Sequence, residues 1–237
     1  MVLRLNNLKS LTIFICLIPL FWLLVDIVSD NLGSNPIQAI HIRLGDWSLR
    51  FLCLTLTITP IQIIANLRGM SACRQMLGLY TFFYASLHIL TYIIVDQVFV
   101  WHVIGIDIIE SPYIWFGLLA YIIIFLLAIT TPKSAKKRMG KNWKKLHRFI
   151  YLAAIAAVVH YFWQLKGNLA EPLFYLIIVT LLLAFRFLVW VKNRKFNKMM
   201  IPTRKKVLVL PKKTIGVSET IVEQQGIMLD SWGKDDL

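Results

Sequence analysis

Six long apolar segments constrain this 237-residue chain more than any other feature of its sequence. A helix that crosses a bilayer needs about 20 mostly apolar residues. Six segments meet or approach that requirement, at approximately 11–28, 47–65, 76–95, 113–131, 149–164 and 172–191. The fifth is short, and its helix is expected to begin earlier, near Trp143. We therefore predict an all-α membrane protein whose fold is a six-helix transmembrane bundle.

The composition agrees with a membrane location. Apolar residues make up 58% of the chain, above the roughly 45–50% of soluble domains. The net charge is nevertheless +14. The basic residues cluster between the apolar segments and form no basic face of a soluble domain, which favours contact with membrane lipid over binding of nucleic acid.

The basic residues also predict an orientation. The N-terminal segment and the segments 66–75, 132–148 and 192–206 carry nearly all of them, whereas the loops 29–46, 96–112 and 165–171 hold only Arg43 and Lys166. Basic segments next to spans stay in the cytoplasm, so both termini are expected to be cytoplasmic. Residues 1–10 are then a cytoplasmic N-terminus, 11–195 the transmembrane domain and 196–237 a cytoplasmic tail, which is either flexible or a docking segment. The sequence shows no evident internal repeat.

Two of the five histidines, His88 and His160, lie inside apolar spans. Ionisable groups inside a membrane are costly and usually functional, although a neutral imidazole can also bond a neighbouring helix. Both histidines lie roughly 16–18 Å along spans that run outward from the cytoplasm. Equal depth on two helices allows two imidazoles to ligate one haem iron from opposite faces, and such a haem transfers electrons. His41 and His102 lie in outer loops, where solvent-exposed side chains are expected.

His147 lies at the cytoplasmic end of the fifth span, before His160. On a continuous ideal helix the two would be roughly 20 Å apart along the axis and about 140° apart around it. A second haem ligated by His147 would suit a transmembrane electron path, but the third span offers Arg74 and Gln75 at the matching height. His147 and Arg74 are alternatively a site for a haem propionate or a flavin phosphate. Arg186, inside the sixth span, either extends to the interface or pairs with a propionate.

Several stretches of the sequence together resemble one known family. They are 139–152 (MGKNWKKLHRFIYL), 159–163 (VHYFW), 74–79 (RQMLGL) and 86–88 (SLH). Over roughly residues 10–195 they are similar to the haem-binding membrane subunit of the bacterial periplasmic methionine-sulfoxide reductase system, the MsrQ (YedZ) family of the ferric-reductase-like transmembrane group. The resemblance implies a multi-pass protein of the bacterial inner membrane that binds one or two haem b groups, and FMN. His88, His147 and His160 match the family's haem-associated histidines.

The resemblance also implies a function, as an electron-transfer subunit of an oxidoreductase system. Electrons would come from a cytoplasmic flavin reductase or the quinone pool and go to a periplasmic molybdopterin subunit, which reduces methionine sulfoxide in oxidised envelope proteins. The chain has no G-x-G-x-x-G motif of its own, so the donor is expected to be a separate molecule. The alternatives are a stand-alone transmembrane ferric reductase, a quinol-oxidising b-type cytochrome, and a transporter or scaffold without redox function.

Overall fold

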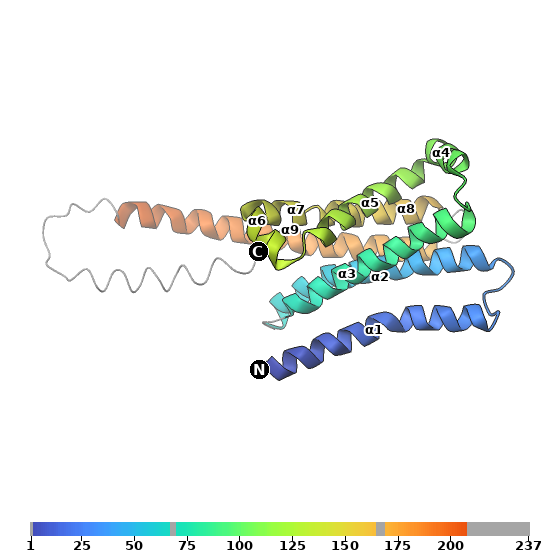
Figure 1. The fold of residues 1–237 in the computed structure, drawn as a ribbon. Coiled ribbons are helices and arrows are strands. Elements are labelled where there is room, and N and C mark those ends of the chain that lie inside the picture. The colour runs from blue at the N-terminus through green and yellow to red at the C-terminus, as the bar shows by residue number, and fades with distance from the viewer. Residues whose placement is uncertain (1, 67–69, 165–168, 208–237) are drawn as a thin grey trace, which may run out of the picture. The chain divides into compact units, whose positions relative to one another are not determined.

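A computed structural model describes residues 2–66, 70–164 and 169–207, with side chains described between residues 10 and 194 of these ranges. All regular secondary structure in the described residues is helical (Figure 1). The elements are α1 (Val2–Val28), α2 (Pro36–Ile64), α3 (Ser71–Leu90), the π-helix η1 (Thr91–Asp96), α4 (Trp101–Glu110), α5 (Pro112–Ile129), α6 (Lys133–Met139), α7 (Lys141–His147), α8 (Ile150–Gln164) and α9 (Ala170–Val207).

The structure confirms the all-α fold and the six spans. Within the described residues, six helical segments are long and apolar enough to cross a membrane: Ser10–Val28, Pro36–Ile64, Ser71–Asp96, Pro112–Ile129, Lys141–Gln164 and Ala170–Arg194. The chain is therefore a multi-pass membrane protein. Its residues divide into two compact units, Met1–Val189 and Trp190–Leu237, and α9 begins in the first and ends in the second. Of the tail predicted over 196–237, residues 196–207 belong to α9, and residues 208–237 lie outside the described residues.

The second span begins earlier than its apolar segment suggests. Asn35 caps α2, accepting a hydrogen bond from the backbone N–H of Gln38 at 3.2 Å, and Pro36 occupies the first turn, where its missing N–H has no cost. Arg43 forms an ion pair with the buried Asp26 of α1. Because these polar groups have partners, the helix continues outward through residues that we predicted to form a loop.

The outer loop predicted over 96–112 also contains regular structure. The third span ends as the π-helix η1, and the chain then turns through Val98 and Phe99, which both have positive φ angles. Helix α4 follows, and Pro112 starts α5. π-Helical turns occur frequently at functional sites, and η1 begins three residues after His88.

Two helical hairpins, α2–α3 and α5–α8, form the centre of the bundle, and α3 also contacts α5 and α1 (Figure 1). The contact with α1 depends on Tyr84, which is fully buried. Its hydroxyl donates to the carbonyl of Cys16 at 2.8 Å and accepts from the N–H of Leu20 at 3.1 Å. These two backbone groups pair with each other in a regular helix. Tyr84 therefore joins α3 to α1 beside Pro19, where helices commonly bend.

The fifth span is interrupted near its N-terminal end. Helix α7 ends at His147, Arg148 and Phe149 form a turn, and α8 begins at Ile150. The rotation predicted between His147 and His160 assumed one continuous helix, and the structure does not have that continuous helix.

Candidate functional site

His88 of α3 and His160 of α8 face one another inside the bundle, as their equal depths predicted. Their ring centroids are 6.4 Å apart, and the ring planes are nearly perpendicular at 83°. Both side chains are partly buried. The packing of the two central hairpins therefore brings together two imidazoles that are distant in sequence.

A backbone carbonyl fixes each of these imidazoles. Nδ1 of His88 lies 2.9 Å from the carbonyl oxygen of His41, and Nδ1 of His160 lies 2.8 Å from that of Tyr113. A carbonyl can only accept a hydrogen bond, so Nδ1 of each ring must carry the hydrogen. In a neutral imidazole, Nε2 then has a free lone pair. Histidines that bind metals are commonly oriented in this way.

Two glycines make these contacts possible. A Cβ atom on Gly117 would lie 2.8 Å from Nδ1 of His160, and one on Gly45 would lie 3.0 Å from Cε1 of His88. Real Cβ atoms essentially never approach as closely as the distance at Gly117, and the distance at Gly45 is tighter than nine in ten real Cβ contacts. Each histidine ring therefore packs against a helix face that lacks a side chain, one turn after the carbonyl that it bonds.

The two halves of the site repeat one another. The accepting carbonyl precedes its histidine by 47 residues in both hairpins. Three pairs of matching positions are separated by the same number of residues. They are Gly45 and Gly117, His88 and His160, and the Thr-Pro pairs at 59–60 and 131–132. Our expectation of no internal repeat is therefore wrong: the repeat consists of a few matching positions in otherwise different apolar helices.

The spacing of the two rings fits one metal ion between them. Metal–imidazole bonds are about 2 Å long, so two rings bound to one metal have centroids about 6 Å apart. Among the described residues, no group of three or more histidine, cysteine, aspartate or glutamate side chains could hold a metal ion. Two opposed neutral imidazoles are the ligands that a haem iron needs, because the porphyrin supplies the other four nitrogens.

The two histidines that were predicted to lie in outer loops, His41 and His102, differ from each other. His102 is exposed on α4, as expected of a solvated residue, although in a helix. His41 does not lie in a loop, and its predicted solvation is wrong. It belongs to α2, and its ring stacks on that of His88 with centroids 3.8 Å apart. The prediction failed because the contact of His41 with His88 joins residues 47 apart in the sequence.

His147 lies apart from this pair, at the end of α7. Its ring stacks on Trp143 with a centroid distance of 3.9 Å, and its Nε2 lies 3.2 Å from the hydroxyl of Thr130. The indole of Trp143 donates to the Thr130 carbonyl at 2.8 Å. Arg74 and Lys136 are close enough to His147 to interact with it electrostatically.

The two predicted arginines meet at one hydroxyl. Thr59 Oγ1 accepts from Arg186 at 2.9 Å and from Arg74 at 3.3 Å. Arg186 also donates to the Tyr151 hydroxyl and the Leu56 carbonyl. Its Nε is buried without a hydrogen-bond partner among the described residues. The guanidinium groups of Arg74 and Arg186 thus meet at Thr59, and Arg74 also lies close to His147. Their positive charge suits an anionic group.

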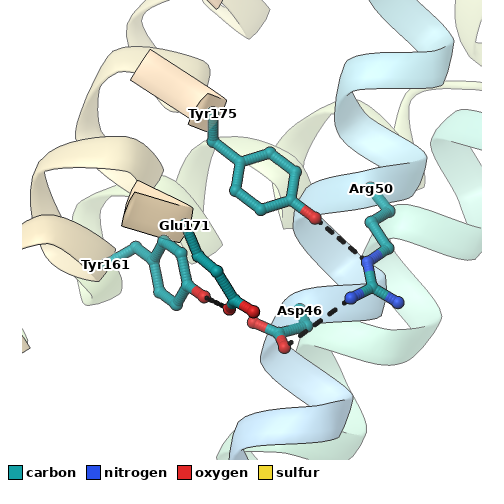
Figure 2. A network of polar contacts seen from close by, with 5 residues as sticks. All are labelled: Asp46, Arg50, Tyr161, Glu171 and Tyr175. Atoms are coloured by element: carbon teal, nitrogen blue, oxygen red, sulfur yellow. Dashed lines mark hydrogen bonds and ion pairs between the residues drawn. The ribbon is translucent and has the colours of Figure 1, made fainter. Parts of the chain in front are cut away.

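Figure 2 shows a polar network that the sequence did not predict. Tyr161 follows His160 and donates to Glu171 of α9 at 2.9 Å. Arg50 of α2 donates to Tyr175 of α9 at 3.0 Å and lies 3.9 Å from the carboxylate of Asp46. The network joins α9 to α2 and α8. Its residues are spread along the sequence, and no local pattern marks them.

Comparisons with known proteins agree with this architecture. Residues 44–158 match the family model described as the ferric reductase like transmembrane component. The chain is 39% identical over 195 residues to the protein-methionine-sulfoxide reductase heme-binding subunit MsrQ of Rhodospirillum rubrum, covering 81% of this chain and 94% of that protein. Proteins of the same name match at 39% in Polaromonas naphthalenivorans (79% and 87% covered) and at 37% in Herminiimonas arsenicoxydans (82% and 91%). Identity of this extent shows that the chain belongs to the MsrQ family.

Proposed function

We propose that this protein binds haem b and carries electrons through the bacterial inner membrane to a methionine-sulfoxide reductase. The observation that carries the proposal is the opposed pair His88 and His160, with both Nδ1 atoms bonded to carbonyls and both Nε2 atoms available. Two imidazole ligands would leave no open position on the iron, and this arrangement favours electron transfer over oxygen chemistry. The relatives named above are haem-binding subunits, which agrees with this assignment.

The chain's own residues hold and orient the group. The carbonyls of His41 and Tyr113 keep the two rings from rotating and keep Nε2 unprotonated, while Gly45 and Gly117 provide the space. Both rings are partly buried in the bundle, where the local dielectric is lower than in water. When bound, the haem supplies a one-electron carrier.

The cluster of His147, Arg74 and Arg186 is the proposed second cofactor site. It takes either a second haem, with His147 as ligand, or the phosphate of FMN, with the arginines as partners. In the first case the Nε2 of His147 must leave the Thr130 hydroxyl, because that contact occupies the ligating nitrogen. The position of this cluster at the end predicted to be cytoplasmic suits entry of electrons from a flavin reductase or quinol.

The acceptor is proposed to be a periplasmic molybdopterin subunit that reduces methionine sulfoxide. The excess of basic residues predicts which end of the bundle faces the cytoplasm. Electrons that enter at that end would leave at the periplasmic end. The relatives are named as subunits of a protein-methionine-sulfoxide reductase, which supports this partner. A stand-alone ferric reductase would instead reduce metal chelates without any partner, so assays of the purified chain with each acceptor distinguish the two.

Absorption spectra test the haem site directly. The reduced-minus-oxidised spectrum of the purified protein should show low-spin haem bands, and a pyridine haemochrome assay with flavin analysis gives the stoichiometry. His88→Ala and His160→Ala should each lower haem content at the paired site by at least about tenfold, because loss of even an outer-shell partner commonly costs 10–100-fold in affinity.

His102→Ala is the matched control, since this histidine is exposed on α4. It should keep the full spectrum. His147→Ala should leave the haem of the His88–His160 pair in place and remove only a second haem or the flavin. A wild-type protein without haem bands, or unchanged spectra in both His88→Ala and His160→Ala, would contradict the proposal.

A further inference from the structure

The imidazole of His41 lies beside the histidine pair, although it is not one of the two proposed haem ligands. Its backbone carbonyl accepts the hydrogen bond of His88, and its imidazole lies over the His88 ring at a centroid distance of 3.8 Å and an angle of 32°. It also lies close enough to His160 to interact electrostatically. The imidazole of His41 therefore lies next to both histidines of the pair.

One nitrogen of this ring is buried without a partner. Nδ1 of His41 has almost no exposed surface, and no described residue forms a hydrogen bond with it. A buried polar atom left unpaired costs about 1–3 kcal/mol, and such atoms in native proteins commonly bond a ligand or water.

The neighbouring polar groups are already engaged. The ring of Tyr92 lies 6.3 Å from that of His41, but its hydroxyl donates to Asp107 at 2.7 Å. Nδ1 of His88 is bonded to the carbonyl of His41 itself. In the structure, neither adjacent ring forms a hydrogen bond with the Nδ1 of His41.

We propose that Nδ1 of His41 donates a hydrogen bond to a propionate carboxylate of the haem held by His88 and His160. This inference rests on the proposed function. The propionates are the charged edge of an otherwise apolar group, so they turn toward the aqueous side. His41 lies one helical turn before Gly45, the glycine against which the His88 ring packs, and under the predicted orientation this turn is on the outer side.

Such a bond has two physical consequences. A neutral imidazole has one N–H, and placing it on Nδ1 satisfies both the buried nitrogen and a carboxylate oxygen. Hydrogen bonds to ionised groups are about twice as strong as those between neutral groups. Drawing negative charge away from the haem edge also makes addition of an electron easier, so the donor raises the midpoint potential. His41 is thus a positioning and tuning residue, and it leaves the axial ligands unchanged.

Two substitutions separate hydrogen bonding from stacking. His41→Phe keeps an aromatic ring against His88 but has no donor, whereas His41→Asn keeps an N–H near the position of Nδ1 but has no ring. Each is purified with haem, together with wild type and the control His102→Phe. Resonance Raman spectra report the propionate bending mode, and spectroelectrochemical titration gives the midpoint potential.

In His41→Phe we expect the low-spin haem bands to remain, the propionate mode to shift and the midpoint potential to fall. His41→Asn should restore both values toward wild type, and His102→Phe should match wild type. Loss of haem in His41→Phe but not in His41→Asn also supports the donor role. An unchanged propionate mode in His41→Phe overturns the inference, as does loss of haem in both variants. A wild-type protein without haem bands instead contradicts the proposed function.

Discussion

At the scale of single residues, a missing side chain matters as much as a histidine. His88 and His160 were predictable, because an imidazole in an apolar span has few explanations other than function. Gly45 and Gly117 were not, because glycine is common in membrane helices and has no chemistry of its own. Only the packed structure shows that an imidazole occupies the space where each Cβ would be.

This close packing predicts the effect of adding one methyl group. Gly117→Ala should displace the His160 ring from the Tyr113 carbonyl, because the new Cβ would lie 2.8 Å from Nδ1. Overpacking costs about 1–3 kcal/mol, and loss of an outer-shell bond about 10–100-fold in haem affinity. Gly45→Ala should act in the same direction but less strongly, since its closest contact is 3.0 Å. Haem content per protein measures both effects.

Gly105→Ala is the matched control, since nothing lies within 4 Å of the Cβ position at this glycine of α4. It should retain wild-type haem content. Full haem content in Gly117→Ala would show that the His160 contact with Tyr113 is not needed for binding.

At the scale of helices, polar contacts attach α9 at its first turns and again near its middle, at Arg186. Arg50 and Tyr161 hold its first turns through Tyr175 and Glu171 (Figure 2). Arg186 holds it further along, through contacts that include the Leu56 carbonyl. Between these points α8 and α9 line an apolar hollow of about 470 Å³. The apolar segment predicted that α9 exists, but only these distant partners determine where it packs.

The polar attachment predicts a stability effect without loss of cofactor. Tyr175→Phe removes the hydrogen bond from Arg50 while keeping the buried ring, so it should lower the free energy of unfolding by about 1 kcal/mol. Haem content should stay at the wild-type level, because Tyr175 contacts neither histidine of the pair. Thermal unfolding of the haem-loaded protein in one detergent measures the change. Tyr80→Phe, which removes only a 3.5 Å exposed contact with Ile13, should change stability less.

At the scale of the whole molecule, six spans require both termini on the same side of the membrane. The excess of basic residues in the segments 132–148 and 192–206 predicts that this side is the cytoplasm. A phosphatase that is active only outside the cytoplasm should therefore be active when fused after residue 34 and inactive when fused after residue 140 or residue 237. Activity at residue 237 would reverse the predicted direction of electron transfer.

The sequence by itself determined the number of spans, the all-helical fold and the two histidines at matching depth. Each of these depends on the apolar character of one segment, because a segment spans the bilayer according to its own length and composition. Only the tertiary structure decided that His41 stacks on His88 and that Arg74 and Arg186 share Thr59. These contacts join residues on different helices. They depend on how the helices are rotated and packed, which the hydropathy of any single segment leaves open.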